Sequence, residues 1–109
     1  MSVETLPEVK EYLNNLITIL YEKDYFGFEE TAWKYADDLL NDIITTLHLR
    51  LYRPAPNYFD KYGKNMQYAI FRKNKRTTWY AFFTKYRQNE EIIYLIRYIA
   101  NNHIIAQYL

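Results

Sequence analysis

The chain has 109 residues, which is enough for one domain spanning residues 1–109 and too few for two domains of ordinary size. Half of the residues are hydrophobic and only two are glycine, so the composition is that of a folded chain and not of a disordered one. A net charge of +1 excludes a strongly basic or acidic protein, and the absence of cysteine excludes a disulfide framework and a thiolate metal site.

Apolar residues never form a run near the ~20 positions that span a bilayer, so no membrane partner is expected. No basic segment followed by an apolar one opens the sequence, which argues against a secretory signal. We therefore expect a cytoplasmic location.

The charges are divided unevenly along the chain. Residues 1–48 contain three basic and ten acidic residues, whereas residues 49–109 contain eleven basic and three acidic ones. Such an imbalance indicates an anionic partner for the basic half. Alternatively, the acidic half packs near the basic half within the fold, and no partner is needed.

The acidic half predicts two amphipathic helices that form an αα-hairpin. Residues 2–6 are a weak candidate for a short strand, and Thr5 and Glu8 have the spacing of a capping box, so a helix is expected from about Pro7. A second helix is expected over residues 28–47, with a short connection before it. The apolar stripes of the two helices are Val9, Leu13, Leu16, Ile17, Leu20 and Tyr21, and Ala32, Tyr35, Ala36, Leu39, Leu40, Ile43, Ile44 and Leu47.

The basic half predicts a sheet. Residues 49–65, which contain Pro54 and Pro56, are expected to be an irregular crossing segment. Three strands rich in β-branched and aromatic residues follow at residues 66–73, 77–86 and 91–100. Short polar turns join them into an antiparallel meander, and residues 101–109 form a short helix or an extended tail. The expected fold class is α+β, with the N-terminal αα-hairpin packed on a three- to four-stranded antiparallel sheet.

Both faces of the last two strands are apolar or aromatic. Simple alternation places Trp79 and Phe83 on one side of the second strand and Phe82 on the other. The helices can cover only one face of the sheet. The other face would then be an exposed apolar patch of the kind that binds a partner.

A basic cluster surrounds the turn between the first two strands. It consists of Arg72, Lys73, Lys75 and Arg76, with Lys61 and Lys64 upstream. Cations of this kind recognise phosphate, and bases can stack on aromatic rings beside them, here Tyr68, Trp79, Tyr80 and Tyr98. The alternative is an ordinary solvated hairpin tip.

Arg97 is the least ordinary position, because alternation places it between Leu95 and Ile99 on an apolar face. A guanidinium there must be paired, for example with an acidic helix residue, or must line a groove. His103 follows two asparagines at the end of the same strand and is either structural or a proton donor. The two histidines lie in different elements, so no metal site is expected.

Two segments carry a resemblance to a known family: residues 68–83 (YAIFRKNKRTTWYAFF) and residues 95–103 (LIRYIANNH). Together with an acidic helical hairpin, a proline-containing link and the lysine-glycine turn at residues 61–64 (KYGK), they resemble the RelE/ParE superfamily. These proteins are the toxins of bacterial type II toxin–antitoxin systems. The likeness covers nearly the whole chain in outline and is specific over about residues 58–109.

The resemblance implies a mechanism. Members resembling RelE bind in the ribosomal A site and cleave mRNA without a metal or other cofactor, because the 2′-hydroxyl of the RNA attacks the adjacent phosphate. By this resemblance, Arg97 would stabilise the transition state. The proton donor would be His103, Tyr98 or Tyr108. The residues that hold phosphate would be Arg72, Lys73, Lys75 and Arg76.

Other interpretations remain open. Members resembling ParE inhibit DNA gyrase, and the near-neutral charge of this chain motivates that alternative, because nucleases of the RelE type tend to be strongly basic. Both kinds are neutralised by a cognate antitoxin protein that covers the apolar surface. The doubly apolar strands are also compatible with a protein-binding module that has no catalytic activity.

Overall fold

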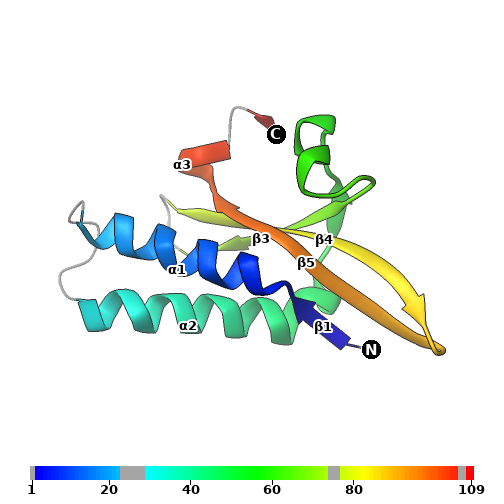
Figure 1. The fold of residues 1–109 in the computed structure, drawn as a ribbon, viewed down its shortest axis with the longest axis horizontal. Coiled ribbons are helices and arrows are strands. Elements are labelled where there is room, and N and C mark those ends of the chain that lie inside the picture. The colour runs from blue at the N-terminus through cyan, green and yellow to red at the C-terminus, as the bar shows by residue number, and fades with distance from the viewer. Residues whose placement is uncertain (1, 23–28, 74–76, 106–107) are drawn as a thin grey trace.

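The computed structural model describes residues 2–22, 29–73, 77–105 and 108–109 (Figure 1). The elements follow the chain as β1 (Ser2–Thr5), α1 (Pro7–Glu22), α2 (Glu29–Thr46), η1 (Leu47–Leu49), β2 (Tyr52–Pro54), η2 (Asn57–Tyr62), β3 (Gln67–Arg72), β4 (Thr78–Gln88), β5 (Glu91–Asn101) and α3 (Asn102–Ile105). The α+β class and the order of two helices before a meander are as predicted. Lys75 and Arg76 lie outside the described residues.

The sheet differs from the prediction in strand number and direction. It has five strands in the order β1-β5-β4-β3-β2, and β1 runs parallel to β5 while the other neighbours are antiparallel. The weak N-terminal strand finds its partner at the opposite end of the chain, with Thr5 opposite Ile96. The segment expected to be irregular supplies β2, which pairs with β3.

The helices α1 and α2 lie side by side and run in opposite directions along one face of the sheet (Figure 1). Most described members of the predicted stripes are buried or half-buried, with Leu13 and Ile43 almost inaccessible, whereas Ile44 is exposed and does not join the core. They pack on alternate residues of the strands, among them Trp79, Ala81 and Phe83. Alternation in β4 is therefore as predicted.

The predicted capping box is wrong. The Thr5 hydroxyl is buried and has no hydrogen-bond partner among the residues that the structure describes. The backbone of Leu6 closes this end of α1, because its carbonyl accepts from the Val9 N–H at 3.0 Å. Thr5 is held in β1 by its pairing with β5, and this strand pairing overrides the local capping preference.

The second face of the sheet is covered, so the predicted exposed apolar patch is wrong. Phe59 of η2 and Ile105 of α3 are both buried against this face. The remaining members of this second core are Met66, Tyr68, Phe82, Tyr98 and Ala100. The aromatic residues on both sides of the strands thus reflect two cores, one on each face.

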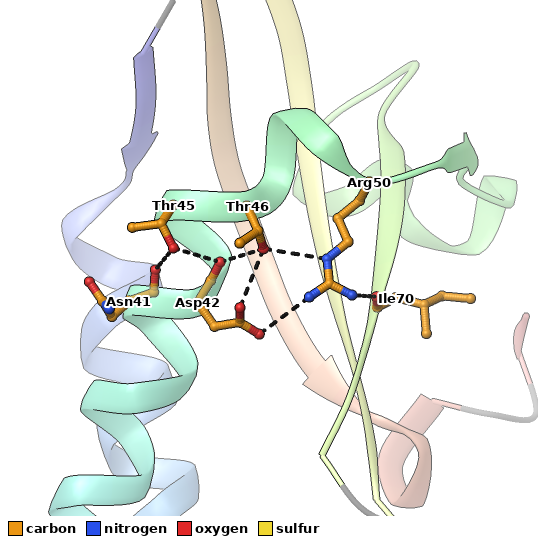
Figure 2. Close-up of polar contacts among 6 residues, drawn as sticks. All are labelled: Asn41, Asp42, Thr45, Thr46, Arg50 and Ile70. Carbon is orange, nitrogen blue, oxygen red and sulfur yellow. Dashed lines mark hydrogen bonds and ion pairs between the residues drawn. The ribbon is translucent and has the colours of Figure 1, made fainter.

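Arg50 ties the end of α2 to the sheet (Figure 2). Its guanidinium donates to the Thr46 hydroxyl at 3.3 Å and to the Ile70 carbonyl at 3.4 Å, and it pairs with the Asp42 carboxylate at 3.4 Å. It also lies 4.4 Å from the ring centroid of Phe71. This ion pair lies at the boundary between the acidic and the basic half of the chain and anchors the end of α2.

A buried hydrogen bond between helix and sheet gives a stability prediction. The indole N–H of Trp79, which is 0% exposed, donates to the Tyr35 hydroxyl at 2.8 Å. Tyr35→Phe leaves that donor without this acceptor, so we expect a loss of about 1–3 kcal/mol in the free energy of unfolding, measured with urea. Tyr86→Phe, at an exposed site on β4, is the matched control and should change little. Equal stability of Tyr35→Phe and the parent protein would show that this hydrogen bond contributes nothing.

Candidate functional site

A β-bulge places Arg97. In the pairing of β4 with β5, Phe82 lies opposite Tyr98 whereas the next residue, Phe83, lies opposite Ile96. Arg97 is therefore the extra residue of β5 and has no partner opposite it in β4. Its Nε donates to the Thr84 hydroxyl at 2.8 Å. Among the described residues its partner is thus a hydroxyl and not the acidic helix residue that an ion pair would need.

The bulge also reverses the alternation of side chains along β5. Tyr94 and Ile96 belong to the helix-side core, as does Ile99, whereas Tyr98 belongs to the second core. The prediction that Arg97 shares the face of Ile99 is therefore wrong. The extra residue shifts the in-and-out alternation of the side chains by one position, and this shift turns Arg97 to the other face of the sheet.

Gly63 makes room for the arginine. It follows η2 with a φ of 155°, and a β-carbon there would lie 2.7 Å from Cδ of Arg97 and 3.2 Å from Sδ of Met66. Since real β-carbons do not approach so closely, any other residue at this position would displace the arginine stem. The lysine-glycine turn and the bulge therefore fix Arg97 from two sides.

A run of tyrosine rings passes beside Arg97, and we call it the tyrosine row. Its members are Tyr108, Tyr58, Tyr62, Tyr98 and Tyr12. The rings of Tyr58 and Tyr108 are stacked with centroids 3.7 Å apart, and those of Tyr62 and Tyr98 are stacked at 3.9 Å. The Tyr12 ring lies 5.5 Å from that of Tyr98 at a tilt of 40°.

Lys61 joins the two stacked pairs. Its ammonium lies 4.2 Å from the ring centroid of Tyr58 and 5.4 Å from that of Tyr62, and it donates to the Tyr58 hydroxyl at 3.1 Å. Such contacts are favourable cation–π interactions. Lys61 and Arg97 thus place two cations along one line of aromatic rings.

A pocket opens where α1 begins beside the bulge. The Leu6 N–H donates to the Ile96 carbonyl at 3.3 Å, so the chain leaves β1 and enters α1 next to Arg97. The cavity has a volume of about 230 Å³. It is lined by Glu8, Val9, Tyr12, Tyr62, Arg97 and Tyr98.

The phenols of the tyrosine row have different electrostatic environments. Burial, with a smaller contribution from the hydrogen bond to Tyr12, raises the pKa of Tyr98, so its phenol keeps its proton far above neutral pH. The hydrogen bond from Lys61, with a further one involving Tyr108, lowers the pKa of Tyr58. The exposed phenol of Tyr58, whose pKa is lowered, therefore loses its proton more readily than the buried phenol of Tyr98, whose pKa is raised.

This difference predicts a titration result. Lys61→Met removes the donor that stabilises the Tyr58 phenolate, so the pKa of Tyr58 should rise toward its ordinary value of 10.0. The measurement is a pH titration followed by phenolate absorbance or by ring proton shifts, with Tyr58→Phe identifying the Tyr58 signal. Superimposable titrations of Lys61→Met and the parent protein would contradict the assigned role of Lys61.

The other predicted site residues are dispersed. Arg72 is exposed at the end of β3. It lies four residues after Tyr68, which belongs to the second core, so alternation along the strand places Arg72 on that face of the sheet. Arg97 lies on the same face. The Lys73 N–H donates to the Thr77 carbonyl at 3.1 Å as the turn begins. Lys64 lines a separate hollow of about 430 Å³ that Asp60 also lines.

His103 belongs to α3 by its backbone, and its side chain lies outside the described part of the chain. Tyr108 was predicted as a proton donor and is found stacked on Tyr58. The structure therefore brings together Arg97, Tyr98, Lys61 and Tyr108 through intervening tyrosines. Among the described residues, no hydrogen bond, ion pair or ring contact joins Lys64 or Lys73 to them.

Sequence reasoning missed several members of this site, among them Tyr12, Tyr58, Tyr62 and Thr84. Tyr12 lies three residues after Val9 on α1 and contacts both cores. A single apolar stripe on the helix therefore does not predict its position. Tyr58 adjoins the buried Phe59 in a segment without an amphipathic pattern. The available signal was compositional, since thirteen tyrosines are many for 109 residues.

Within the described ranges, no helix combines the length and the apolar character that crossing a membrane requires. Nor do three or more His, Asp or Glu side chains gather there in a way that would hold a metal ion. Comparison with protein-family models, with curated proteins and with solved structures gave no match.

Proposed function

We propose that the protein is the toxin of a type II toxin–antitoxin system and acts as a metal-independent, ribosome-dependent mRNA endonuclease. The observation that supports this best is Arg97, fixed by Thr84 and Gly63 beside the tyrosine row. A fixed guanidinium suits a phosphate, and aromatic rings suit unstacked bases. The RelE/ParE-like order of helical hairpin, basic turn and arginine-bearing last strand agrees with the same function.

In this proposal a single RNA strand lies along the tyrosine row, with its backbone against Lys61 and Arg97. The 2′-oxygen of one nucleotide attacks the adjacent phosphorus, so that a P–O2′ bond forms and the P–O5′ bond breaks. The 2′-hydroxyl proton passes to a base and the departing 5′-oxygen takes a proton from an acid. The charge that develops on the phosphorane is stabilised by Arg97.

The proton donor is drawn from His103, Tyr108 and Tyr98. Tyr98 suits this role poorly, because its raised pKa makes it a weak acid and its ring is stacked on Tyr62. We therefore assign Tyr98 to ring stacking with Tyr62 and not to proton transfer. Tyr58 enters as a further candidate for proton transfer, since its pKa is lowered by Lys61 and its side chain is exposed.

The proposed reaction defines the partners. The ribosome and mRNA are the target, which places the protein in the cytoplasm, and a cognate antitoxin protein neutralises it. Arg72 and the predicted phosphate-binding residues Lys73, Lys75 and Arg76 would extend the contact with ribosomal RNA from the turn between β3 and β4. No cofactor takes part.

The test uses purified protein with translating ribosomes and a defined mRNA, followed by mapping of the new RNA ends. We expect cleavage within ribosome-bound codons, 2′,3′-cyclic phosphate and 5′-hydroxyl ends, and no dependence on divalent metal beyond that of the ribosome. Intact mRNA after incubation of the protein with translating ribosomes would reject the nuclease.

The alternative is a ParE-like inhibitor of DNA gyrase, which the net charge of +1 favours. A supercoiling assay with purified gyrase separates the two activities. Inhibited supercoiling with intact mRNA would establish the alternative. If neither target is affected, a non-catalytic protein-binding role is favoured.

A further inference from the structure

The pocket beside Arg97 is built for a small flat ligand. Its volume of about 230 Å³ is below the ~300–1,000 Å³ of sites for drug-sized ligands, so it admits one ring system and not two. Tyrosine side chains from α1, η2 and β5 supply its aromatic walls. Because Tyr62 and Tyr98 already stack on each other, an aromatic ring that enters the pocket would meet ring edges or the faces outside this stacked pair.

Arg97 supplies the cation of this pocket. Its Nε is committed to the Thr84 hydroxyl, and its two Nη groups have no hydrogen bond to any residue that the structure describes. The bond to Thr84 fixes the plane of the guanidinium and leaves its Nη donors for a ligand. A phosphate or carboxylate can accept two parallel N–H bonds from such a group.

Glu8 supplies the opposite charge. It lies in the first turn of α1, is exposed, and lines the same pocket. A carboxylate only accepts hydrogen bonds, so it favours a ligand with N–H donors near the aromatic ring. The pocket thus combines an anion-binding group, aromatic walls and an acceptor of N–H groups.

We propose that this pocket binds one unstacked guanine of single-stranded RNA, with Glu8 accepting from the base and Arg97 holding a neighbouring phosphate. The inference rests on the proposed function for its choice of RNA. Guanine is favoured because its ring N–H and exocyclic amino group are adjacent donors that match the two oxygens of a carboxylate. The other three bases place an acceptor beside each donor, so a carboxylate meets at most one favourable contact.

The experiment is a titration of the intact protein with the four ribonucleoside 5′-monophosphates, followed by NMR shifts of the tyrosine rings. We expect saturable binding of guanosine monophosphate, with affinity about tenfold above that of the other three nucleotides. Inorganic phosphate and guanosine are titrated separately to isolate the two ends of the ligand. If inorganic phosphate alone gave NMR shifts of the same size and bound with the same affinity, the proposal that the pocket binds a base would be overturned.

Glu8→Gln and Glu11→Gln form the matched pair of variants. Both residues are exposed glutamates of α1, but only Glu8 lines the pocket. Glu8→Gln should abolish the preference for guanine, whereas Glu11→Gln should keep it. An unchanged preference in Glu8→Gln, or the absence of saturable binding by any nucleotide at millimolar concentration, would overturn the proposal.

The failure of this inference is distinguishable from the failure of the proposed function. Cleavage of mRNA on ribosomes by a protein that binds no nucleotide in this pocket would leave the nuclease and remove the guanine site. Guanine-selective binding that Glu8→Gln abolishes, without any cleavage of mRNA, would leave the site and reject the nuclease.

Discussion

Replacing Arg97 by alanine is expected to lower the rate of mRNA cleavage on ribosomes by about 100- to 1,000-fold, the loss seen when one fixed donor to a developing oxyanion is removed. The bulge and the Thr84 hydrogen bond hold the guanidinium before RNA arrives, so little reorganisation accompanies the reaction. The measurement is single-turnover cleavage of mRNA in a programmed ribosome, with circular dichroism and thermal unfolding to verify the fold.

Two further variants separate the effect of the position of the Arg97 guanidinium from the effect of its charge. Arg97→Lys keeps the charge but loses the planar donor pair and the Nε–H that Thr84 accepts, so it should recover only a small part of the rate. Arg87→Ala removes an exposed arginine near the far end of β4 and should leave the rate unchanged. Equal loss in Arg87→Ala and Arg97→Ala would show that general charge, and not the bulge site, drives the activity.

Much of the secondary structure follows from local patterns. The stripes of Leu13 and Ile43, at steps of three and four, predict the helices, and runs of β-branched and aromatic residues predict β3, β4 and β5 within two residues at each end. The strand β1 was predicted only weakly, and its parallel pairing was not predicted. Ile96, the partner of Thr5, is ninety-one positions away along the chain, and no local pattern encodes such a pairing.

The candidate site could be predicted only in part, and Arg97 shows why. A charged residue between apolar neighbours is conspicuous in the sequence, and this pattern predicts Arg97 as a site residue. The face of the sheet toward which Arg97 points was not predicted, because a one-residue bulge reverses every side chain beyond it. Neither Gly nor Pro marks the position of this bulge in the sequence. Tyr12 and Tyr62 come from other elements, and only the tertiary fold brings them to Tyr98.

The second core gives the other large effect. Phe59 of η2 is 0% exposed, and its ring centroid lies 4.4 Å from that of Phe82. Phe59→Ala should lower the free energy of unfolding by about 3–5 kcal/mol, a large share of the ~5–15 kcal/mol typical of a domain. Urea unfolding measures this loss. Leu51→Ala, at a side chain that is 96% exposed, is the control and should change stability by less than about 0.5 kcal/mol.

Phe59→Ala also tests whether the second core positions the site. The residue lies between Tyr58 and Lys61 in η2, so losing its anchor on the sheet should release both from their places beside Tyr108 and Tyr62. The pKa of Tyr58 should then rise toward its ordinary value in the variant that still folds, as in Lys61→Met. A Tyr58 titration that stays as in the parent protein, despite a large loss of stability, would show that η2 keeps its geometry without Phe59. The tyrosine row would then be held by its own ring stacking, and the aromatic core beneath it would serve stability alone.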